Sequence, residues 1–191
     1  MVSPWSRVVT IRFLDGFARS SPRDNDRPMS ASASIRIVPY DKARHGDQPW
    51  RVVSAVFEEY GFPFAESDYD ADLLDPATHY DGVRGWFAVA EDEVGKVVGC
   101  VGVTDEGDGL FELHRLYVLA GTRRGGAGSR LVQWVFDTAR AHACRRMVLF
   151  SDVHFEDAHR LYLGHGFRNN RFRYAPDPWQ SREWGFVRDF E

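Results

Sequence analysis

The sequence predicts an α+β fold, in which an antiparallel meander is followed by a β-α-β crossover within one mixed sheet. Three strand-like segments follow one another at residues 85–91, 96–104 and 109–118, with short turns between them, which is typical of a meander. An amphipathic segment at 128–143 then precedes a short apolar run at 145–153. A helix that leads into such a buried strand favours a crossover to a parallel strand.

The segments before this centre predict one edge strand and two flanking helices. Residues 34–40 (SIRIVPY) predict a strand, and residues 48–62 predict a helix that stops at Gly61. The apolar stripe of this helix comprises Val52, Val53, Val56 and Tyr60. A shorter helix is expected at 67–75, where Pro76 ends it.

The C-terminal segments continue the alternation. Residues 155–167 predict a helix with Gly166 as its C-cap. Its inward stripe comprises Ala158, Leu161 and Tyr162. Two closing strands are expected at 171–175 and 182–190. The order of elements is therefore βααβββαβαββ, with helices flanking the sheet.

Composition divides the chain into a leader and a domain. The 191 residues are the length of a single domain, and 43% of them are hydrophobic, which is enough for a core. Residues 1–34 contain a Ser-, Arg-, Asp- and Pro-rich stretch with little to bury, so they predict a disordered N-terminal extension. The folded domain is then expected at 35–191.

The charge and the apolar pattern exclude several classes of protein. A net charge of -4 argues against a nucleic-acid partner, which usually requires a basic surface. No apolar run approaches the roughly 18 residues of a membrane span, and no secretory signal precedes the domain. Cys100 and Cys144 form no CxxC pair and are interpreted as free thiols in a reducing compartment. We expect a soluble cytoplasmic protein that does not bind a membrane.

A glycine-rich loop, RRGGAGSRLV at 123–132, stands between a predicted strand and a predicted helix. Backbone N–H groups at a helix N-terminus attract anions, and glycines let an anion approach them, so the loop predicts a phosphate site. A nucleoside triphosphate is disfavoured because no GK[ST] follows. A dinucleotide is disfavoured because the preceding strand belongs to a meander rather than to an opening parallel β-α-β unit. The pyrophosphate of coenzyme A fits.

Three segments together carry a resemblance to a known family. Arg123–Gly128 matches the pattern [Q/R]xxGx[G/A], ELHRLYV precedes it, and AHRLYLGHGF follows the next strand. Over about residues 35–191 the chain resembles the GNAT superfamily of acyl-CoA-dependent N-acetyltransferases. The resemblance implies acetyl-CoA as co-substrate, no metal, and cofactor contacts from two segments. These contacts are Leu116, Tyr117, Val118, Arg123, Arg124, Gly125, Gly126, Ala127, Gly128 and Ser129.

The strand before the loop changes the parity of its apolar residues. Phe111 and Leu113 are apolar early in the strand, whereas Leu116 and Val118 take over later. A one-residue bulge produces such a change. The resemblance implies this bulge, with the strand splayed from the one at 146–153, so that pantetheine amides pair with the backbone of Leu116 and Val118. A strand buried on both faces would show the same residues.

The resemblance also implies the catalytic residues of an acyl transfer by direct attack of an amine. The Val118 N–H is the implied donor to the developing oxyanion, and Tyr162 is the implied acid for the leaving thiolate. Glu112 is the leading candidate for the base, and His114, two residues on, is an alternative. Tyr162 could instead be a core tyrosine, and Glu112 could be a solvated carboxylate. Glu183 could reach the site or pair with an arginine.

One departure limits the resemblance, and one histidine pattern bears on a metal. Phe155 stands where the family often has Asn, which removes one common polar contact to coenzyme A. His154, His159 and His165 are five and six residues apart, which is not the spacing of a helical metal site, so no metal is expected.

The acceptor is expected to be an unidentified amine, either a small molecule or a peptide. Acidic residues crowd the segment 58–75 and could form a lid for a cationic amine, although a solvated surface is the simpler interpretation. A non-catalytic acyl-CoA-binding regulatory module is the alternative function, and assembly as a homodimer stays open. The enzyme requires Tyr162 and a base, whereas the module requires only the glycine loop.

Overall fold

Residues 34–62 and 70–191 are described in the computed structural model, and they form a seven-stranded mixed sheet with flanking helices. The sheet order is β1-β2-β3-β4-β5-β7-β6. The strands are β1 Arg36–Pro39, β2 Gly85–Glu91, β3 Val97–Gly107, β4 Leu110–Val118, β5 Arg146–Asp152, β6 Arg168–Tyr174 and β7 Arg182–Asp189. The helices are α1 Lys42–His45, α2 Gln48–Tyr60, α3 Ala71–Leu74, α4 Pro76–His79, α5 Ala127–Ala141 and α6 Glu156–Gly164, with a 3₁₀ turn at Ala120–Thr122.

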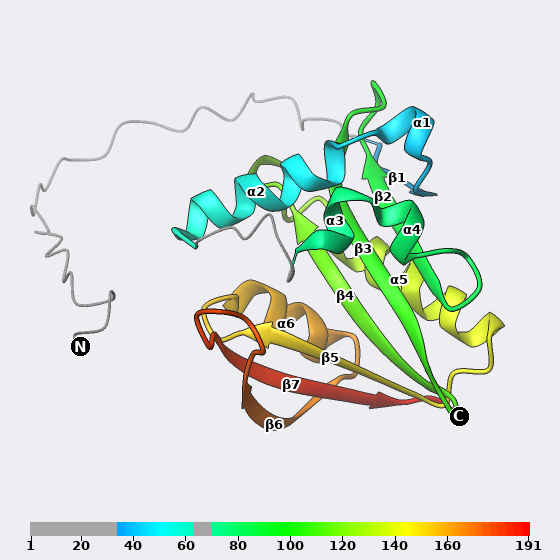
Figure 1. Ribbon diagram of the computed structural model, residues 1–191, viewed down its shortest axis with the longest axis vertical. Helices are drawn as coiled ribbons and strands as arrows, with labels where there is room; N and C mark the ends of the chain where they lie inside the picture. The colour runs from blue at the N-terminus through cyan, green and yellow to red at the C-terminus, as the bar shows by residue number, and fades with distance from the viewer. Residues whose placement is uncertain (1–33, 63–69) are drawn as a thin grey trace, which may run out of the picture. The chain divides into compact units, whose positions relative to one another are not determined.

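The strand directions confirm the α+β prediction. Strands β1 to β4 pair antiparallel as a meander, and α5 connects β4 to β5, which run parallel. Strand β7 then pairs antiparallel with both β5 and β6. Figure 1 shows α2, α3 and α4 in front of the sheet and α5 behind it.

The differences from the predicted elements lie in short helices. Part of the helix expected at 67–75 falls outside the described residues; the described part ends at Leu74, and Pro76 begins α4 instead of only ending α3. Proline suits the first helical turn because its missing N–H has no partner there. The single-turn α1 was too short for a periodic pattern. In α6 the C-cap is His165, and Gly166 follows it with a φ of +80°.

Two apolar cores lie on the two faces of the sheet. The larger one joins the sheet to α5 and α6 and contains Leu131, Phe136 and Met147. The smaller one joins the sheet to α2 and α3 and contains Val53 and Leu73. The amphipathic helices therefore bury most of their predicted stripes against opposite faces, which is the usual way for helices to stabilise a sheet, whereas Tyr60 of the predicted α2 stripe lies outside the smaller core.

Strand β4 contains the bulge that its parity change predicts. Gly102 pairs with His114 and Cys100 with Tyr117, so Val101 alone stands opposite Arg115 and Leu116. Arg115 has a φ of +53°, a left-handed conformation that is uncommon outside glycine. Consequently Phe111, Leu113, Leu116 and Val118 all pack into the larger core despite their change of parity.

Strands β4 and β5 separate soon after they begin. Their pairing covers only Leu110–Glu112 against Arg146–Val148. Beyond Glu112 the two strands diverge, as the green and yellow arrows of Figure 1 show. A parallel pair that opens in this way leaves backbone groups of the bulged strand without a neighbouring strand.

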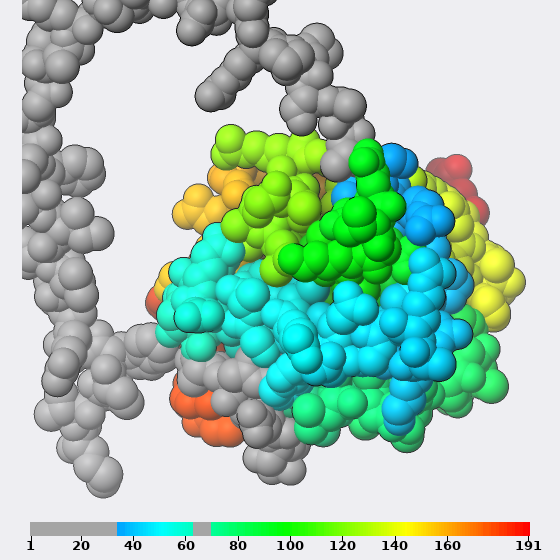
Figure 2. Space-filling model, turned by 90° about the horizontal axis from the view of Figure 1, so that it is seen from above, coloured from blue at the N-terminus to red at the C-terminus, as the bar shows by residue number. Residues whose placement is uncertain are grey.

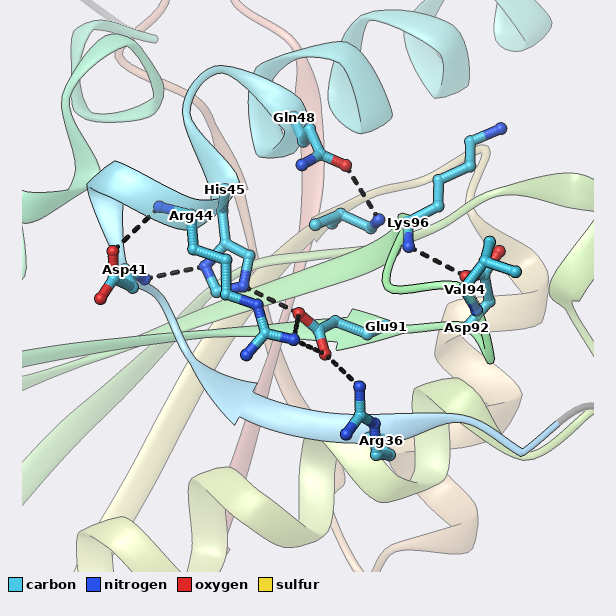
Figure 3. A network of polar contacts seen from close by, with 10 residues as sticks. Arg36, Asp41, Arg44, His45, Gln48, Glu91, Asp92, Val94 and Lys96 are labelled. Carbon is cyan, nitrogen blue, oxygen red and sulfur yellow. Dashed lines mark hydrogen bonds and ion pairs between the residues drawn. The ribbon is translucent and has the colours of Figure 1, made fainter.

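A buried carboxylate fixes the edge of the sheet that lies near α1. Glu91 is fully buried and lies 3.1 Å from Arg36, 2.7 Å from Arg44 and 3.0 Å from Nε2 of His45 (Figure 3). The backbone N–H of Asp41 donates to Nδ1 of His45, so Nε2 carries the hydrogen and donates to Glu91. The cluster therefore ties α1 to β1 and β2.

We expect Glu91→Gln to lower the free energy of unfolding by about 2 kcal/mol, the usual contribution of hydrogen bonds to a charged group. The amide keeps the shape of the side chain but removes the charge that Arg36, Arg44 and His45 share. Urea unfolding checks the value. None of these residues lines the cavity described below, so ligand affinity measured at low temperature should match the wild type. A loss of affinity would contradict this separation of stability from function.

Candidate active site

A cavity of about 640 Å³ opens where β4 and β5 separate. Its walls come from β4, β5, α6, the end of α2, the glycine loop and the β6–β7 hairpin. The volume lies in the range of ligand sites, and a site at a break in a sheet can recognise a ligand by backbone hydrogen bonds. The predicted catalytic residues Glu112, Val118 and Tyr162 all line this cavity.

The glycine loop forms one end of the cavity and the N-terminus of α5. Gly126 is the N-cap with a φ of +82°, and its carbonyl accepts from the N–H of Arg130. The N–H groups of residues 127–129 therefore precede the first backbone hydrogen bond of the helix. A Cβ on Gly128 would lie 3.1 Å from Leu161, whereas a Cβ on Gly126 would meet nothing within 4 Å.

The predicted loop residues divide into two groups. Arg123, Arg124, Gly126, Gly128 and Ser129 line the cavity. Gly125 and Ala127 do not line it, and Ala127 is buried in the larger core. The Ser129 hydroxyl lies 2.6 Å from Nε2 of His165, which ties the start of α5 to the end of α6.

Arg123 holds the loop against α2. Its guanidinium forms a two-bonded ion pair with Glu59, at 2.6 and 2.7 Å, and its Nε donates to the carbonyl of Val118. In Figure 2 the cyan atoms of α2 lie against the light-green segment that leads into this loop. Arg124 is exposed, so it is the more available cation of the two.

The bulged strand turns a backbone edge toward the cavity. The N–H of Leu119 donates to the carbonyl of Val98 in β3. Because successive N–H groups of a strand point to opposite sides, those of Val118 and Leu116 point away from β3. Leu116, Tyr117 and Val118 all line the cavity, as the three cofactor contacts in β4 require.

Tyr162 projects from α6 into the base of the cavity. Its side chain is only 4% exposed and packs against Phe167 and Phe186. Within the described part of the chain the Tyr162 hydroxyl has no hydrogen-bond partner, and its oxygen is not completely buried. The hydroxyl therefore faces the cavity. Burial raises the pKa of Tyr162 above its ordinary value, so the phenol keeps its proton at neutral pH.

Glu112 and His114 lie side by side on the cavity face of β4. Oε1 of Glu112 is 3.8 Å from Nδ1 of His114. Burial raises the pKa of Glu112, and Arg173 acts in the opposite direction. Burial, and after it the charge of Arg115, lower the pKa of His114 to about 4, although about a third of its side chain is exposed into the cavity. His114 is therefore neutral at physiological pH.

Acidic residues gather on the side of the cavity away from the loop. We call Glu112, Asp152, Asp177 and Glu183 the acidic lobe; all four line the cavity. Burial raises the pKa of Glu183, its hydrogen bond from Arg173 at 2.7 Å lowers it, and Asp177 and Asp152 raise it again. Arg173 also stacks 3.2 Å over the ring of Phe150. Arg171 lies over the same ring at 4.5 Å and also acts to lower the pKa of Glu112, so the lobe holds four carboxylates against Arg171 and Arg173.

The acidic segment that the sequence singled out has other partners. Glu59 binds Arg123, Asp75 binds Lys42, and Asp70 and Asp72 both bind Arg115 at the bulge. Residues 63–69, which include Glu66 and Asp68, lie outside the described residues. The described acids of this segment therefore serve mainly to hold the loop and the bulge, and only Asp70 among them lines the cavity.

An aromatic wall was missed from the sequence. Phe57, Tyr60 and Phe62 at the end of α2 line the cavity together with Phe155 and Tyr117. The ring of Phe155 lies 4.8 Å from that of Tyr60 and 5.3 Å from that of Phe62. The phenylalanine in place of Asn therefore packs α6 against α2. The sequence assigned Tyr60 to the apolar stripe of its helix, and no pattern singled out Phe57 or Phe62.

Glu106, Glu112 and His114 form the one group of carboxylate and histidine side chains, among the residues described, whose ligand atoms lie within 4.8 Å of one another. Hydrogen bonds account for their positions, because Thr104 lies between His114 and Glu106. His154 and His159 bond to the carboxylate and to the carbonyl of Asp152, and His165 bonds to Ser129.

Comparisons with known proteins agree with this architecture. Residues 50–167 match the model of the acetyltransferase (GNAT) family. The chain is 30% identical to an uncharacterized N-acetyltransferase of Schizosaccharomyces pombe over 143 residues, which cover 74% of this chain and 85% of the relative. It is 26% identical to the aminoalkylphosphonate N-acetyltransferase of Salmonella typhimurium over 151 residues, covering 73% and 92%.

Solved structures show the same fold. A GNAT-family acetyltransferase from Staphylococcus aureus superposes with a TM-score of 0.72 at 20% identity, covering 83% of this chain and all of that one. The NatC complex bound to Gag peptide and CoA gives a TM-score of 0.62 at 18% identity, covering 82% and 99%.

The divergent parallel pair of the sheet and the glycine loop at its opening are consistent with an acyltransferase. The match over residues 50–167 and the related N-acetyltransferases then make the assignment specific: the chain belongs to the GNAT family of acetyltransferases, which uses acetyl-CoA. Among the described residues, no helix has the length and apolarity needed to span a membrane.

Proposed function

We propose that residues 35–191 form an acetyl-CoA-dependent N-acetyltransferase, which transfers the acetyl group directly to a primary amine while both substrates are bound. The observation that carries this proposal is the divergence of β4 and β5 beyond Glu112 into a cavity bordered by the glycine loop. One opening then receives a phosphate-bearing ligand at the loop and an amine at the acidic lobe.

Acetyl-CoA fits the groups that border the cavity. The open space at Gly126 and the N–H groups of residues 127–129 suit a pyrophosphate, and exposed Arg124 adds charge. The backbone edge at Leu116 and Val118 suits the amides of pantetheine. When bound, acetyl-CoA supplies an activated acetyl group and a thiol leaving group. Arg123 contributes mainly by holding the loop through Glu59 and Val118.

Three residues of the chain then do the chemistry. Glu112 takes a proton from the amine, and its raised pKa makes it a better base than an ordinary carboxylate. The N–H of Val118 donates to the carbonyl oxygen of the acetyl group, on which negative charge develops. Tyr162 gives its proton to the departing sulfur, so that coenzyme A leaves as a neutral thiol.

The direct test is release of free thiol when the protein is mixed with acetyl-CoA and a panel of amines. The acetylated amine should appear in equal amount by mass spectrometry. A protein that binds acetyl-CoA but acetylates no amine in the panel would instead favour the regulatory binding module. The named relatives, which are N-acetyltransferases, support the enzyme rather than the binding module.

We expect the acceptor to be a cationic amine without an acidic group. The acidic lobe places four carboxylates against Arg171 and Arg173, so negative charge is in excess, and oppositely charged groups attract in a partly desolvated cavity. For a diamine and an aminoalkylphosphonate of equal chain length, kcat/KM should favour the diamine by about tenfold or more at low salt, and the ratio should shrink as salt rises.

The phosphonate makes this comparison decisive, because the Salmonella relative is an aminoalkylphosphonate N-acetyltransferase. Glu183→Gln should reduce the preference for the diamine, since it removes one charge of the lobe. Asp137→Asn on the exposed side of α5 changes the net charge equally and should leave the preference unchanged. A higher kcat/KM for the phosphonate would overturn the proposed acceptor class.

A further inference from the structure

A hydrogen-bonded chain leads from the molecular surface to the cavity across β3 and β4. Thr104 on β3 stands opposite Glu112 on β4, and Gly102 stands opposite His114. The Thr104 hydroxyl donates to Oε1 of Glu106 at 2.6 Å, and it lies 2.8 Å from Nε2 of His114. Neither Thr104 nor Glu106 lines the cavity, whereas His114 and Glu112 do.

The chain determines which ring nitrogen of His114 carries the hydrogen. Glu106 is exposed, and an ionised carboxylate only accepts hydrogen bonds, so the single hydroxyl hydrogen of Thr104 is committed to it. The Thr104 oxygen can then only accept from His114. The neutral ring must therefore carry its hydrogen on Nε2, which leaves a lone pair on Nδ1.

Nδ1 of His114 and Oε1 of Glu112 are thus two acceptors 3.8 Å apart with no hydrogen to share between them. Both groups line the cavity on the same face of β4. A primary ammonium group has three N–H donors and can bond both atoms at once. If the imidazole were in the other tautomer, its Nδ1–H would donate to the carboxylate, and fewer acceptor atoms would remain for a ligand.

We propose that His114 Nδ1 and Glu112 together bind the ammonium group of the acceptor, and that Thr104 and Glu106 are positioning residues that hold His114 in the Nε2–H tautomer. This inference rests on the proposed acetyl transfer. It adds a second acceptor to the base Glu112 and gives a role to two residues outside the cavity.

The first test measures the tautomer without reference to activity. In ¹⁵N NMR spectra at pH 7, His114 of the wild type should show a protonated Nε2 and an unprotonated Nδ1. Thr104→Val keeps the shape of the side chain but removes the hydroxyl. Nδ1–H can then donate to Glu112, so the variant should shift toward that tautomer. A wild-type ring protonated on Nδ1 would overturn the inference.

The second test measures turnover with saturating acetyl-CoA and a reactive amine. Thr104→Val should lower kcat/KM for the amine by on the order of tenfold, the effect of weakening one hydrogen bond to a charged group. Thr104→Ser keeps the hydroxyl and should retain both the tautomer and turnover. Acetyl-CoA affinity of both variants, measured by calorimetry, should equal that of the wild type.

The outcomes separate this inference from the proposed function. If the wild type binds no acetyl-CoA, the proposed function fails and the inference fails with it. If the wild type acetylates amines and Thr104→Val does so equally well, the inference alone is wrong. If Thr104→Ser is as impaired as Thr104→Val, the hydroxyl is not the determinant and the inference is again wrong.

Discussion

Tyr162→Phe should lower kcat by on the order of 10²-fold, with little change in the affinity for acetyl-CoA. The substitution deletes one oxygen whose only exposure is to the cavity and keeps the ring against Phe167 and Phe186. Positioned acid catalysis is typically worth about 10² to 10⁴ in rate, and a thiolate is already a fair leaving group, so the lower end is expected. Turnover and calorimetric binding of the purified variant measure the two quantities.

Tyr40→Phe is a matched control for this experiment. Its hydroxyl donates to the carbonyl of Gly46 at 2.8 Å, and neither residue lines the cavity. Tyr40→Phe should lose a little stability and keep its turnover, whereas Tyr162→Phe should keep its stability and lose turnover. Acetyl-CoA affinity of Tyr162→Phe should change by less than about threefold, because the hydroxyl acts in the transition state. Turnover within twofold of wild type, with chemistry rate-limiting, would make Tyr162 a packing residue.

The sheet and its larger helices could be predicted from the sequence because each has a pattern of its own. The run GWFAVAE became β2 with the same bounds, and the amphipathic stripe after the glycine loop became α5. The bulge could also be predicted, because Leu113 and Leu116 are three residues apart and would point to opposite faces of a regular strand, yet both pack into one core. Single-turn helices such as α1 could not be predicted, because one turn shows no periodic pattern and an aspartate such as its N-cap Asp41 is equally common in turns.

Only part of the candidate site could be predicted from the sequence, because residues that bind each other but lie far apart along the chain leave no local sequence pattern. Arg123 matched a phosphate loop, yet its side chain is committed to Glu59, which is 64 residues away. Arg115 at the bulge binds Asp70 and Asp72, which are 45 and 43 residues away. Thr104 stood in an ordinary strand, and only the register of β3 against β4 brings it to His114. The sequence therefore indicated segments that border the cavity, but not the long-range partners of their side chains.

Gly126→Val should weaken acetyl-CoA binding by at least about tenfold, which is the second large effect that we expect. A side chain at this position would project into open space at the N-terminus of α5, where the pyrophosphate is proposed to approach the N–H groups of residues 127–129. Each tenfold loss of affinity corresponds to about 1.4 kcal/mol, less than one charge-assisted hydrogen bond to a phosphate commonly contributes. Calorimetric titration with acetyl-CoA gives the dissociation constant directly.

Backbone strain must be separated from this effect, and Gly95 allows the separation. Gly95 in the β2–β3 turn has the same φ of +82°, also has nothing within 4 Å of an added Cβ, and does not line the cavity. An L-residue in this conformation costs about 1–2 kcal/mol at either position, so Gly95→Val and Gly126→Val should lose similar stability. Only Gly126→Val should lose affinity. Equal affinity in the two variants would remove the glycine loop from the acetyl-CoA site, because the strain they share would then be the whole effect of the substitution.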